Sequence, residues 1–354
     1  MKFSDLMLDM ATGDASMEDA YIQEAVGKIN VSHAFFEASY KISELPEGED
    51  FMIVQEAADA GLPTDKGESA ALANESVVQE LGAFYDLIVS TAKKVKQSAD
   101  KDFKALAGLG KGLGVSMGDD INTFAQNLAN GIINGRGKNA KSSILRGHAG
   151  SIELGSRKFL ASMYTKKLTK KYAQGMAKYL AAYGISIADA FNNETVKKYV
   201  GGAGAIKENG GLHAVATGLS NGTGQIIDKA ETTDHGNKYR TNIAAKDIID
   251  LVCCVYIVRI VSDAVIQSAG NKGAKKNAMA AISAAIAGPN GKGKKSVSAA
   301  AHDIDSTIKY ATPKLTNDVV KNIVTGYTDS VYALVEISNG GRAPLPSKAG
   351  SDAE

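Results

Sequence analysis

The side chains best suited to contact another molecule form a run of basic residues and tyrosines between residues 142 and 190. Ammonium and guanidinium groups bind phosphates, and tyrosine rings stack on bases. The same mixture suits an anionic membrane surface, and a solvated helix face with lysine stems along apolar surface is a third interpretation. The basic members are Arg157, Lys158, Lys166, Lys167, Lys170, Lys171 and Lys178, with Tyr164, Tyr172 and Tyr179 between them.

A glycine-rich stretch at residues 105–118 is the second candidate. Its GxGxG spacing occurs in dinucleotide-binding turns, but such a turn follows a strand, and the residues before this one have helical spacing. Gly110, Gly114 and Gly118 stand four residues apart, as in helices that approach one another closely. We favour a third interpretation, a flexible linker followed by an amphipathic helix over residues 119–133.

A lysine-rich segment at residues 288–296 resembles part of a phosphate-binding loop. Gly288, Gly293 and Lys294 fit the motif, but Lys295 stands where Ser or Thr must bind magnesium. The segment also follows a predicted helix rather than a strand. We therefore expect an exposed basic loop and no nucleotide cofactor.

The histidines give no metal-binding spacing. His33 lies on the apolar face of a predicted helix, where a core or rim position is expected. His302, Asp303 and Asp305 form a local trio, but His302 and Asp303 face apart on a helix. With nucleophile and metalloprotease motifs also missing, we expect no enzyme activity, no metal and no small-molecule substrate.

The element that must organise these segments is the most apolar run of the chain, residues 243–266. Five charged residues interrupt it, so it is too short for a membrane span. As a helix it is apolar all round in its middle turns, which requires cover on every side; a buried strand over residues 252–261 is the alternative. Cys253 and Cys254 lie inside it and are expected to be small buried hydrophobes.

Helical spacing recurs in most of the remaining chain, so we predict a mostly α fold: a multi-helix bundle around a central buried helix at residues 243–266, with glycine-rich linkers. Further helices are expected at residues 16–42, 66–96, 119–133, 142–190, 274–287, 298–310 and 316–337, the last two separated at Pro313. The predicted regions are an acidic helical region (1–104), a glycine-rich linker (105–118), a basic helical region (119–200), a glycine-rich hinge (201–242), a helical core (243–337) and a flexible tail (338–354).

The charges are divided along the chain, although the formal net charge is only +1. Residues 1–100 hold 7 Lys and Arg against 19 Asp and Glu, and the remaining residues hold 33 against 20. Such asymmetry suggests a charged partner or the other end of a neighbouring copy. Because small residues bury little area, self-association is a further way to gain burial.

An Ala-, Gly- and Lys-rich helical chain with an acidic front and no tryptophan resembles the internal and ejection proteins of tailed bacteriophages. The resemblance covers the general character of residues 119–337 and includes no diagnostic motif. It implies a virion component, packed in many copies, that forms an oligomeric helical channel. Opposite charges would join successive copies, and the glycine-rich segments would let the helices rearrange.

The expected function is therefore that of a non-enzymatic, self-assembling structural protein. Its expected partners are copies of itself, other virion proteins, and DNA or a membrane surface. Asp5 and Asp9 interrupt the region where a signal peptide is apolar, so we expect the virion or the cytoplasm of the producing cell. The alternatives are a nucleic-acid-binding scaffold that uses the basic face at residues 136–178, and a soluble enzyme of unrecognised class.

Overall fold

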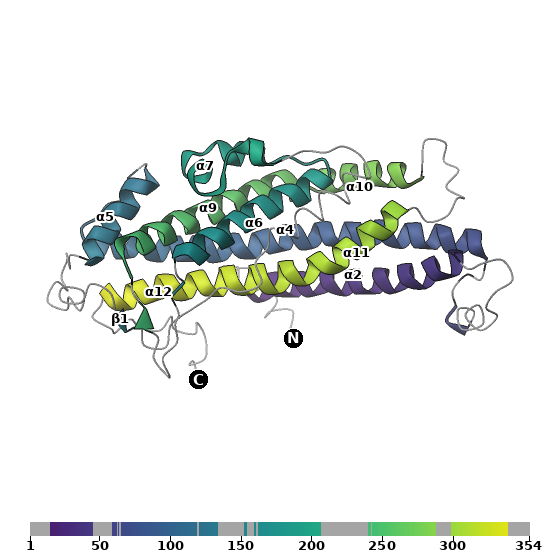
Figure 1. The fold of residues 1–354 in the computed structure, drawn as a ribbon, viewed down its shortest axis with the longest axis horizontal. Helices are drawn as coiled ribbons and strands as arrows, with labels where there is room; N and C mark the ends of the chain where they lie inside the picture. The colour runs from purple at the N-terminus through teal and green to yellow at the C-terminus, as the bar shows by residue number, and fades with distance from the viewer. Residues whose placement is uncertain are drawn as a thin grey trace, which may run out of the picture.

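The computed structural model describes residues 15–44, 59–61, 63, 65–118, 120–133, 152–153, 159–160, 162–206, 240–241, 243–287 and 299–338. The described part is an elongated helical bundle (Figure 1), which confirms the predicted fold class. Its elements are α2 (Ala15–Ser43), α4 (Lys66–Gly112), α5 (Ile121–Ile133), β1 (Ile152–Glu153), α6 (Ser162–Ala182), η3 (Ala188–Asn192), α7 (Glu194–Val200), η4 (Ala203–Ala205), β2 (Arg240–Thr241), α9 (Ala245–Ala269), α10 (Lys272–Ala287), α11 (Ala299–Pro313), η5 (Lys314–Thr325) and α12 (Gly326–Ser338).

Helix α9 is the buried centre that the apolar run predicts. It packs against α4, α5 and α6, and also touches α7, α10 and α12. Cys253 and Cys254 are free thiols and fully buried, and burial raises the pKa of both thiols. The strand alternative for residues 252–261 is therefore wrong, because cover on all sides satisfies an all-apolar helix as well as it would a strand.

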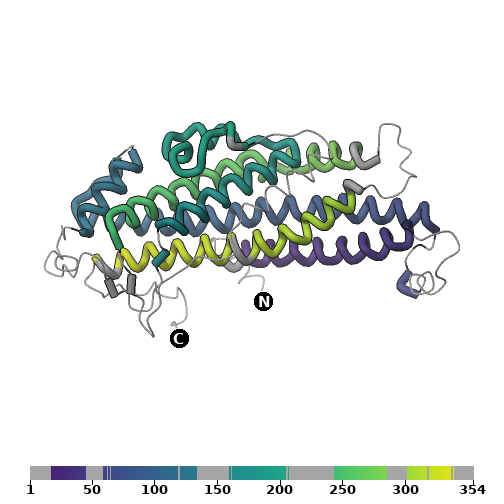
Figure 2. The backbone as a smooth tube through the Cα atoms, in the orientation of Figure 1, coloured from purple at the N-terminus to yellow at the C-terminus, as the bar shows by residue number. Residues whose placement is uncertain are grey.

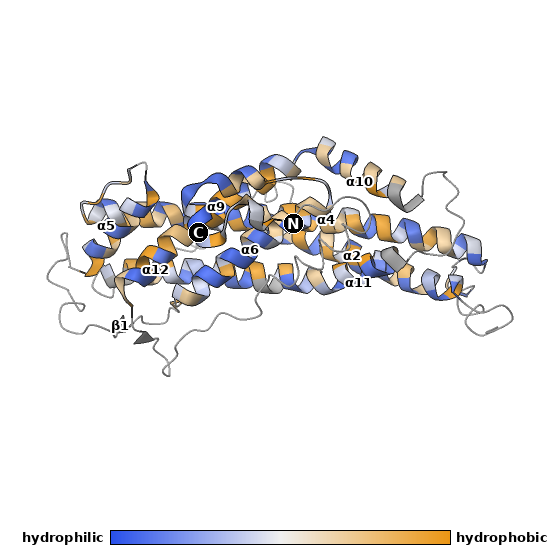
Figure 3. Ribbon diagram, turned by 45° about the horizontal axis from the view of Figure 1, so that its top comes forward, coloured by the Kyte–Doolittle hydropathy of each residue, from blue (hydrophilic) through white to orange (hydrophobic). Residues whose placement is uncertain are grey.

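Helix α4 is the long axis of the bundle and packs against α2, α9, α10, α11, η5 and α12. At 47 residues it spans roughly 70 Å. Its N-terminus is capped by Asp65, whose carboxylate accepts from the backbone N–H of Glu68 at 3.0 Å. Figure 3 shows apolar and polar residues alternating along the long helices, the pattern of rods that bury one face.

The linker predicted at residues 105–118 is wrong over its first part, because α4 continues to Gly112. A Cβ on Gly110 would stand 2.8 Å from the ring of Phe124 in α5, so Gly110 does allow close helix contact. Gly114 has φ +74° and ends the helix: the Val115 N–H donates to the Gly110 carbonyl at 2.8 Å. Gly118 lies in open space. The glycine ridge is thus correct at Gly110 only.

The C-terminal helices form one continuous rod beside α2 and α4 (Figure 2). The break predicted at Pro313 is wrong: the proline has helical φ −61° and ψ −33°, and the π-helical segment η5 follows it directly. Pro lacks the N–H that an α-helix would use, and a wider helical turn tolerates that loss. Gly326, where α12 begins, lies against Leu160, 2.9 Å from where its Cβ would stand.

The single helical pattern predicted at residues 142–190 is wrong at both ends. Ile152 and Glu153 form β1, which pairs antiparallel with β2, and the helix α6 ends at Ala182, where Gly184 takes φ +72°. Met163 is 67% exposed, whereas Tyr172, Met176 and Tyr179 are buried. Tyr172 and Tyr179 are therefore core residues, and their rings are not placed to stack on bases. Of the hinge predicted at residues 201–242, the segment 207–239 lies outside the described residues, as does the tail from residue 339.

The divided charges meet within one chain. Carboxylates of the acidic front pair with cations of the later helices: Asp86 with Lys275 at 2.5 Å, Asp100 with Arg259 at 2.5 Å, and Glu37 with Lys309 at 3.3 Å. Part of the asymmetry is therefore neutralised by folding itself. None of the described helices has both the length and the apolar composition needed to cross a bilayer.

Candidate functional site

The predicted basic face is divided in the structure. Arg157 and Lys158 lie outside the described residues, and the lysines of α6 do not act alike. Lys166 turns inward, with its ammonium 2.8 Å from the Asp250 carboxylate and 5.3 Å from the centre of the Tyr199 ring. Its ammonium therefore joins α6 to α9, while the side chain remains 38% exposed.

The remaining lysines of α6 face outward. Lys167 and Lys170 are exposed, and Lys171 and Lys178 are half-buried. Burial and the ammonium groups of Lys167 and Lys314 lower the pKa of Lys171. A positive patch therefore extends from α6 to the start of η5, although its members come from distant parts of the sequence.

Asp250 is the buried anchor beneath this face. Its carboxylate, 3% exposed, accepts hydrogen bonds from the hydroxyls of Ser162 and Tyr199, the latter at 2.9 Å, and pairs with Lys166. Two hydroxyls and one ammonium therefore replace the water that a buried carboxylate loses. The arrangement therefore satisfies a buried charge and joins α6, α7 and α9.

A different cluster joins α2, α4 and α11. One ligand atom from each of His33, Glu80 and Asp305 lies within 4.8 Å of the others. His33 Nδ1 lies 2.6 Å from Asp305 Oδ1, within hydrogen-bonding distance. Among the described residues this is the group of His, Asp and Glu side chains whose chemistry and spacing suit a metal ion.

Glu80 is the most unusual member of the cluster. Its side chain is 0% exposed, and no donor among the described residues bonds to either carboxylate oxygen. Burial, followed by the neighbouring carboxylate of Asp305, raises the pKa of Glu80 to about 10. At neutral pH a proton on Glu80 therefore neutralises it and lets it donate to Asp305.

A groove of about 350 Å³ reaches this cluster from solvent. His33 lines the groove, and the lining includes Asn30 from α2 and Lys309 and Thr312 from α11. Glu37 stands at the rim, its Oε1 3.2 Å from His33 Nε2 and 3.3 Å from the Lys309 ammonium. His33 thus separates the buried carboxylates from the groove.

Sequence reasoning missed this cluster, because its members are separated by 47 and 225 positions and no local spacing relates them. His33 was expected to lie in the core or at its rim, and it lies at the rim. Its contact with Asp305 was not predicted. His302, which is nearer to Asp305 in the sequence, lies instead against Tyr40, with ring centres 5.2 Å apart and the ring planes tilted by 39°. The available signal was a carboxylate, Glu80, in register with the buried apolar residues Val77 and Phe84 of α4.

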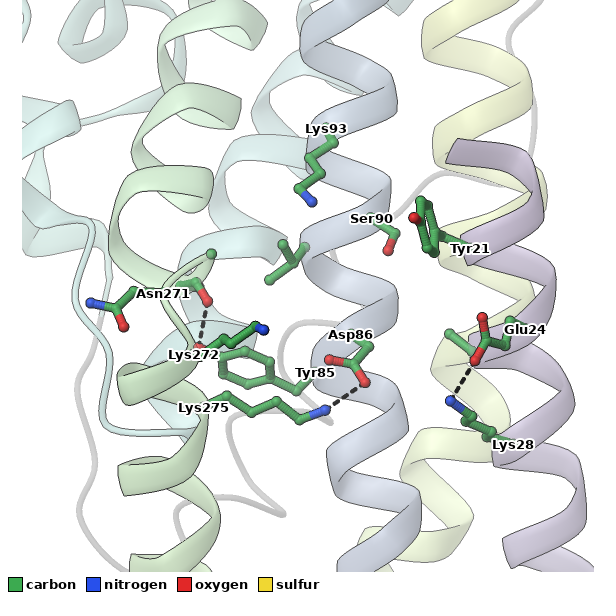
Figure 4. A pocket seen from close by; sticks show the side chains of 14 residues that line it. Tyr21, Glu24, Lys28, Tyr85, Asp86, Ser90, Lys93, Asn271, Lys272 and Lys275 are labelled. Carbon is green, nitrogen blue, oxygen red and sulfur yellow. Dashed lines mark hydrogen bonds and ion pairs between the residues drawn. The ribbon is translucent and has the colours of Figure 1, made fainter. Parts of the chain in front are cut away.

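A second groove, of about 310 Å³, runs over α4 between α2 and α10 (Figure 4). Tyr21, Glu24 and Lys28 of α2 form one wall. On the opposite side Lys275 of α10 bonds to Asp86 of α4, and the Tyr85 hydroxyl donates to the Ala269 carbonyl at 2.8 Å. The lining of the groove is mixed in charge, with Glu24 and Asp86 beside Lys28 and Lys275.

Comparisons with protein-family models, curated proteins and solved structures find no match to this chain.

Proposed function

We propose that this chain is a non-enzymatic structural protein that assembles with copies of itself, and that the first contact is an antiparallel pair of α2 helices. The observation that carries the proposal is an exposed apolar stripe on α2. Tyr21 is 47% exposed, Val31 58% and Phe35 47%. Few other large apolar side chains of the described residues are as exposed as these three.

The stripe has the spacing of a helix-pairing face. Met17, Tyr21, Glu24, Lys28, Val31 and Phe35 alternate in steps of four and three residues, the spacing of a coiled-coil seam. Its first half borders the groove over α4. A helix from a second copy would cover the apolar side chains and fill that groove.

The order of residues in the stripe favours a copy of itself as the occupant. In an antiparallel pair centred on Val26, Glu24 faces Lys28 of the second copy, and Tyr21 faces Val31 of it. Phe35 likewise faces Met17, so apolar residues meet apolar residues and opposite charges meet at the centre. A two-fold interface requires this kind of self-complementary surface.

The virion setting and the channel belong to the proposal as implications of the resemblance. An elongated molecule that pairs through one face can contact further copies through its other faces. Repeated assembly requires such additional contacts. Negative-stain microscopy of concentrated protein, with rings, tubes or shells as the expected result, tests this part. Particles that stay dimeric under all conditions would limit the proposal to a two-fold assembly.

The test of the α2 contact is the mass in solution by light scattering after size-exclusion chromatography. Val31→Glu together with Phe35→Glu places carboxylates in the seam, and we expect the mass to fall to that of one chain. Met163→Glu on α6 is the matched control, since Met163 is also exposed but lies off the stripe. A monomeric wild-type chain, or a dimer that survives the double variant, overturns the proposal.

Charge exchange tests the antiparallel register. Glu24→Lys alone places an ammonium group opposite Lys28 of the second copy and is expected to weaken the dimer about fivefold to tenfold at low salt. In the double variant that also carries Lys28→Glu, position 24 is positive and position 28 is negative. Opposite charges then face each other again, both within one chain and between the two copies. Recovery by the double variant supports the register, and equal loss in both variants contradicts it.

A nucleic-acid scaffold remains the second candidate, favoured by the patch of Lys167, Lys170, Lys171 and Lys314. Because Lys166 pairs with Asp250, it is left unchanged in the test. Changing Lys167, Lys170 and Lys171 to Glu should abolish DNA retention if the patch binds phosphates, and wild-type binding should weaken steeply with salt. If the triple variant still binds DNA, this face of α6 is not the DNA-binding surface.

A further inference from the structure

His33 and Asp305 bond to each other at 2.6 Å, whereas the neighbouring Glu80, 0% exposed, has no donor among the described residues. The two carboxylates stand together at a depth where water cannot reach Glu80, and neither oxygen of Glu80 receives a hydrogen bond from the described residues. Two adjacent carboxylates in such a place require a cation between them. A proton is the smallest cation that serves, and a metal ion is the other.

We propose that His33, Glu80 and Asp305 bind one divalent transition-metal ion of the class that contains Zn²⁺, Mn²⁺ and Co²⁺. One imidazole nitrogen and two carboxylate oxygens suit these ions, whereas Mg²⁺ and Ca²⁺ prefer oxygen ligands throughout. The site is independent of the α2 pairing, because its ligands lie inside one chain.

The geometry needs only a small adjustment. The three ligand atoms lie within 4.8 Å of one another. Zn²⁺ holds nitrogen and oxygen ligands at about 2.0–2.2 Å, so ligands of one ion stand at most about 4 Å apart. Side-chain movements of less than about 1 Å would close the set, and the three helices that carry it are already packed together.

The groove beside His33 supplies the route for the ion. Its rim carries the Glu37 carboxylate, which attracts a cation, and Lys309, which is paired with Glu37. A water molecule from the groove would complete the coordination, since three protein ligands leave a fourth position on Zn²⁺ open. His33 would bind the ion through the ring nitrogen that carries no proton.

The test is calorimetric titration of the untagged full-length chain with ZnCl₂ and with CoCl₂ at about pH 8, where proton competition is weaker. The expected result is one ion per chain, a visible Co²⁺ absorption band and a higher unfolding temperature, with no such response to MgCl₂. Failure of both transition metals to bind overturns the proposal.

Two conservative variants identify the ligands. Glu80→Gln and Asp305→Asn keep the side-chain shape but remove the anionic ligand, and each is expected to weaken binding by at least about 100-fold. Asp303→Asn, on the same helix and exposed, is the matched control and should bind as wild type. Circular dichroism checks that the variants fold, and retained binding in both ligand variants places the ion elsewhere and refutes the site.

Discussion

Asp250 and Glu80 are both buried carboxylates on long helices, and their surroundings are opposite. Asp250 accepts from Ser162 and Tyr199 and pairs with Lys166, whereas Glu80 meets no donor among the described residues and faces Asp305. A carboxylate with a full set of donors stabilises the contact between the helices that carry them. A carboxylate that has to stay protonated can exchange the proton for another cation. The difference separates a structural anchor from a binding group.

The largest effect is expected from Asp250→Ala. The substitution leaves two hydroxyls and an ammonium without their acceptor at the contact of α6 and α9. Removing one partner of a buried ion pair costs about 3–5 kcal/mol, and the half-exposed Lys166 brings the expectation to the lower end of that range. Urea denaturation measures the loss of unfolding free energy.

The control for Asp250→Ala is Asp263→Ala, farther along α9. The Asp263 side chain is 44% exposed, and it lies 3.8 Å from Lys96. Its removal should change the unfolding free energy by no more than about 0.5 kcal/mol. Equal losses from the two substitutions would mean that Asp250 is not an anchor.

Glu80→Gln should act in the opposite direction and only at higher pH. The pKa of Glu80 rises from 4.5 when unfolded to about 10 when folded. Between these values the folded chain holds a proton that the unfolded chain has released, so stability falls as pH rises, by up to about 1.4 kcal/mol per pH unit. The amide of Gln carries no such proton and removes this dependence.

The measurement is urea denaturation of both proteins with a metal chelator present. The variant should gain about 2–3 kcal/mol over wild type between about pH 6 and pH 8. Asp102, whose pKa burial raises to about 7, adds a slope of the same sign, but it is common to both proteins and cancels in the difference. Parallel pH curves would show that Glu80 is ionised in the folded chain.

Asp250 and Glu80 also show which features of the fold could be predicted from the sequence. The apolar residues of 243–266 were enough to predict α9, because they follow one another within a single segment. The continuation of α4 through Gly112 was missed, since glycine lowers helix propensity and only the contact of Gly110 with Phe124 makes the absence of a side chain useful. Local spacing relates neither Asp250 to its donors nor Glu80 to its partners, because those donors and partners lie on other helices than the two carboxylates.

The smallest predicted effect concerns a single donor to the anchor. Tyr199→Phe removes the hydroxyl that lies 2.9 Å from Asp250 and leaves the ring beneath Lys166 in place. Ser162 and Lys166 remain, so the carboxylate keeps partners and the loss should be about 0.5–1.5 kcal/mol. Tyr310→Phe, at a 58% exposed position on α11, is the matched control and should cost nothing measurable by urea denaturation. If Tyr199→Phe costs as much as Asp250→Ala, the three donors act as one cooperative unit; if it costs nothing, the anchor consists of Ser162 and Lys166 alone.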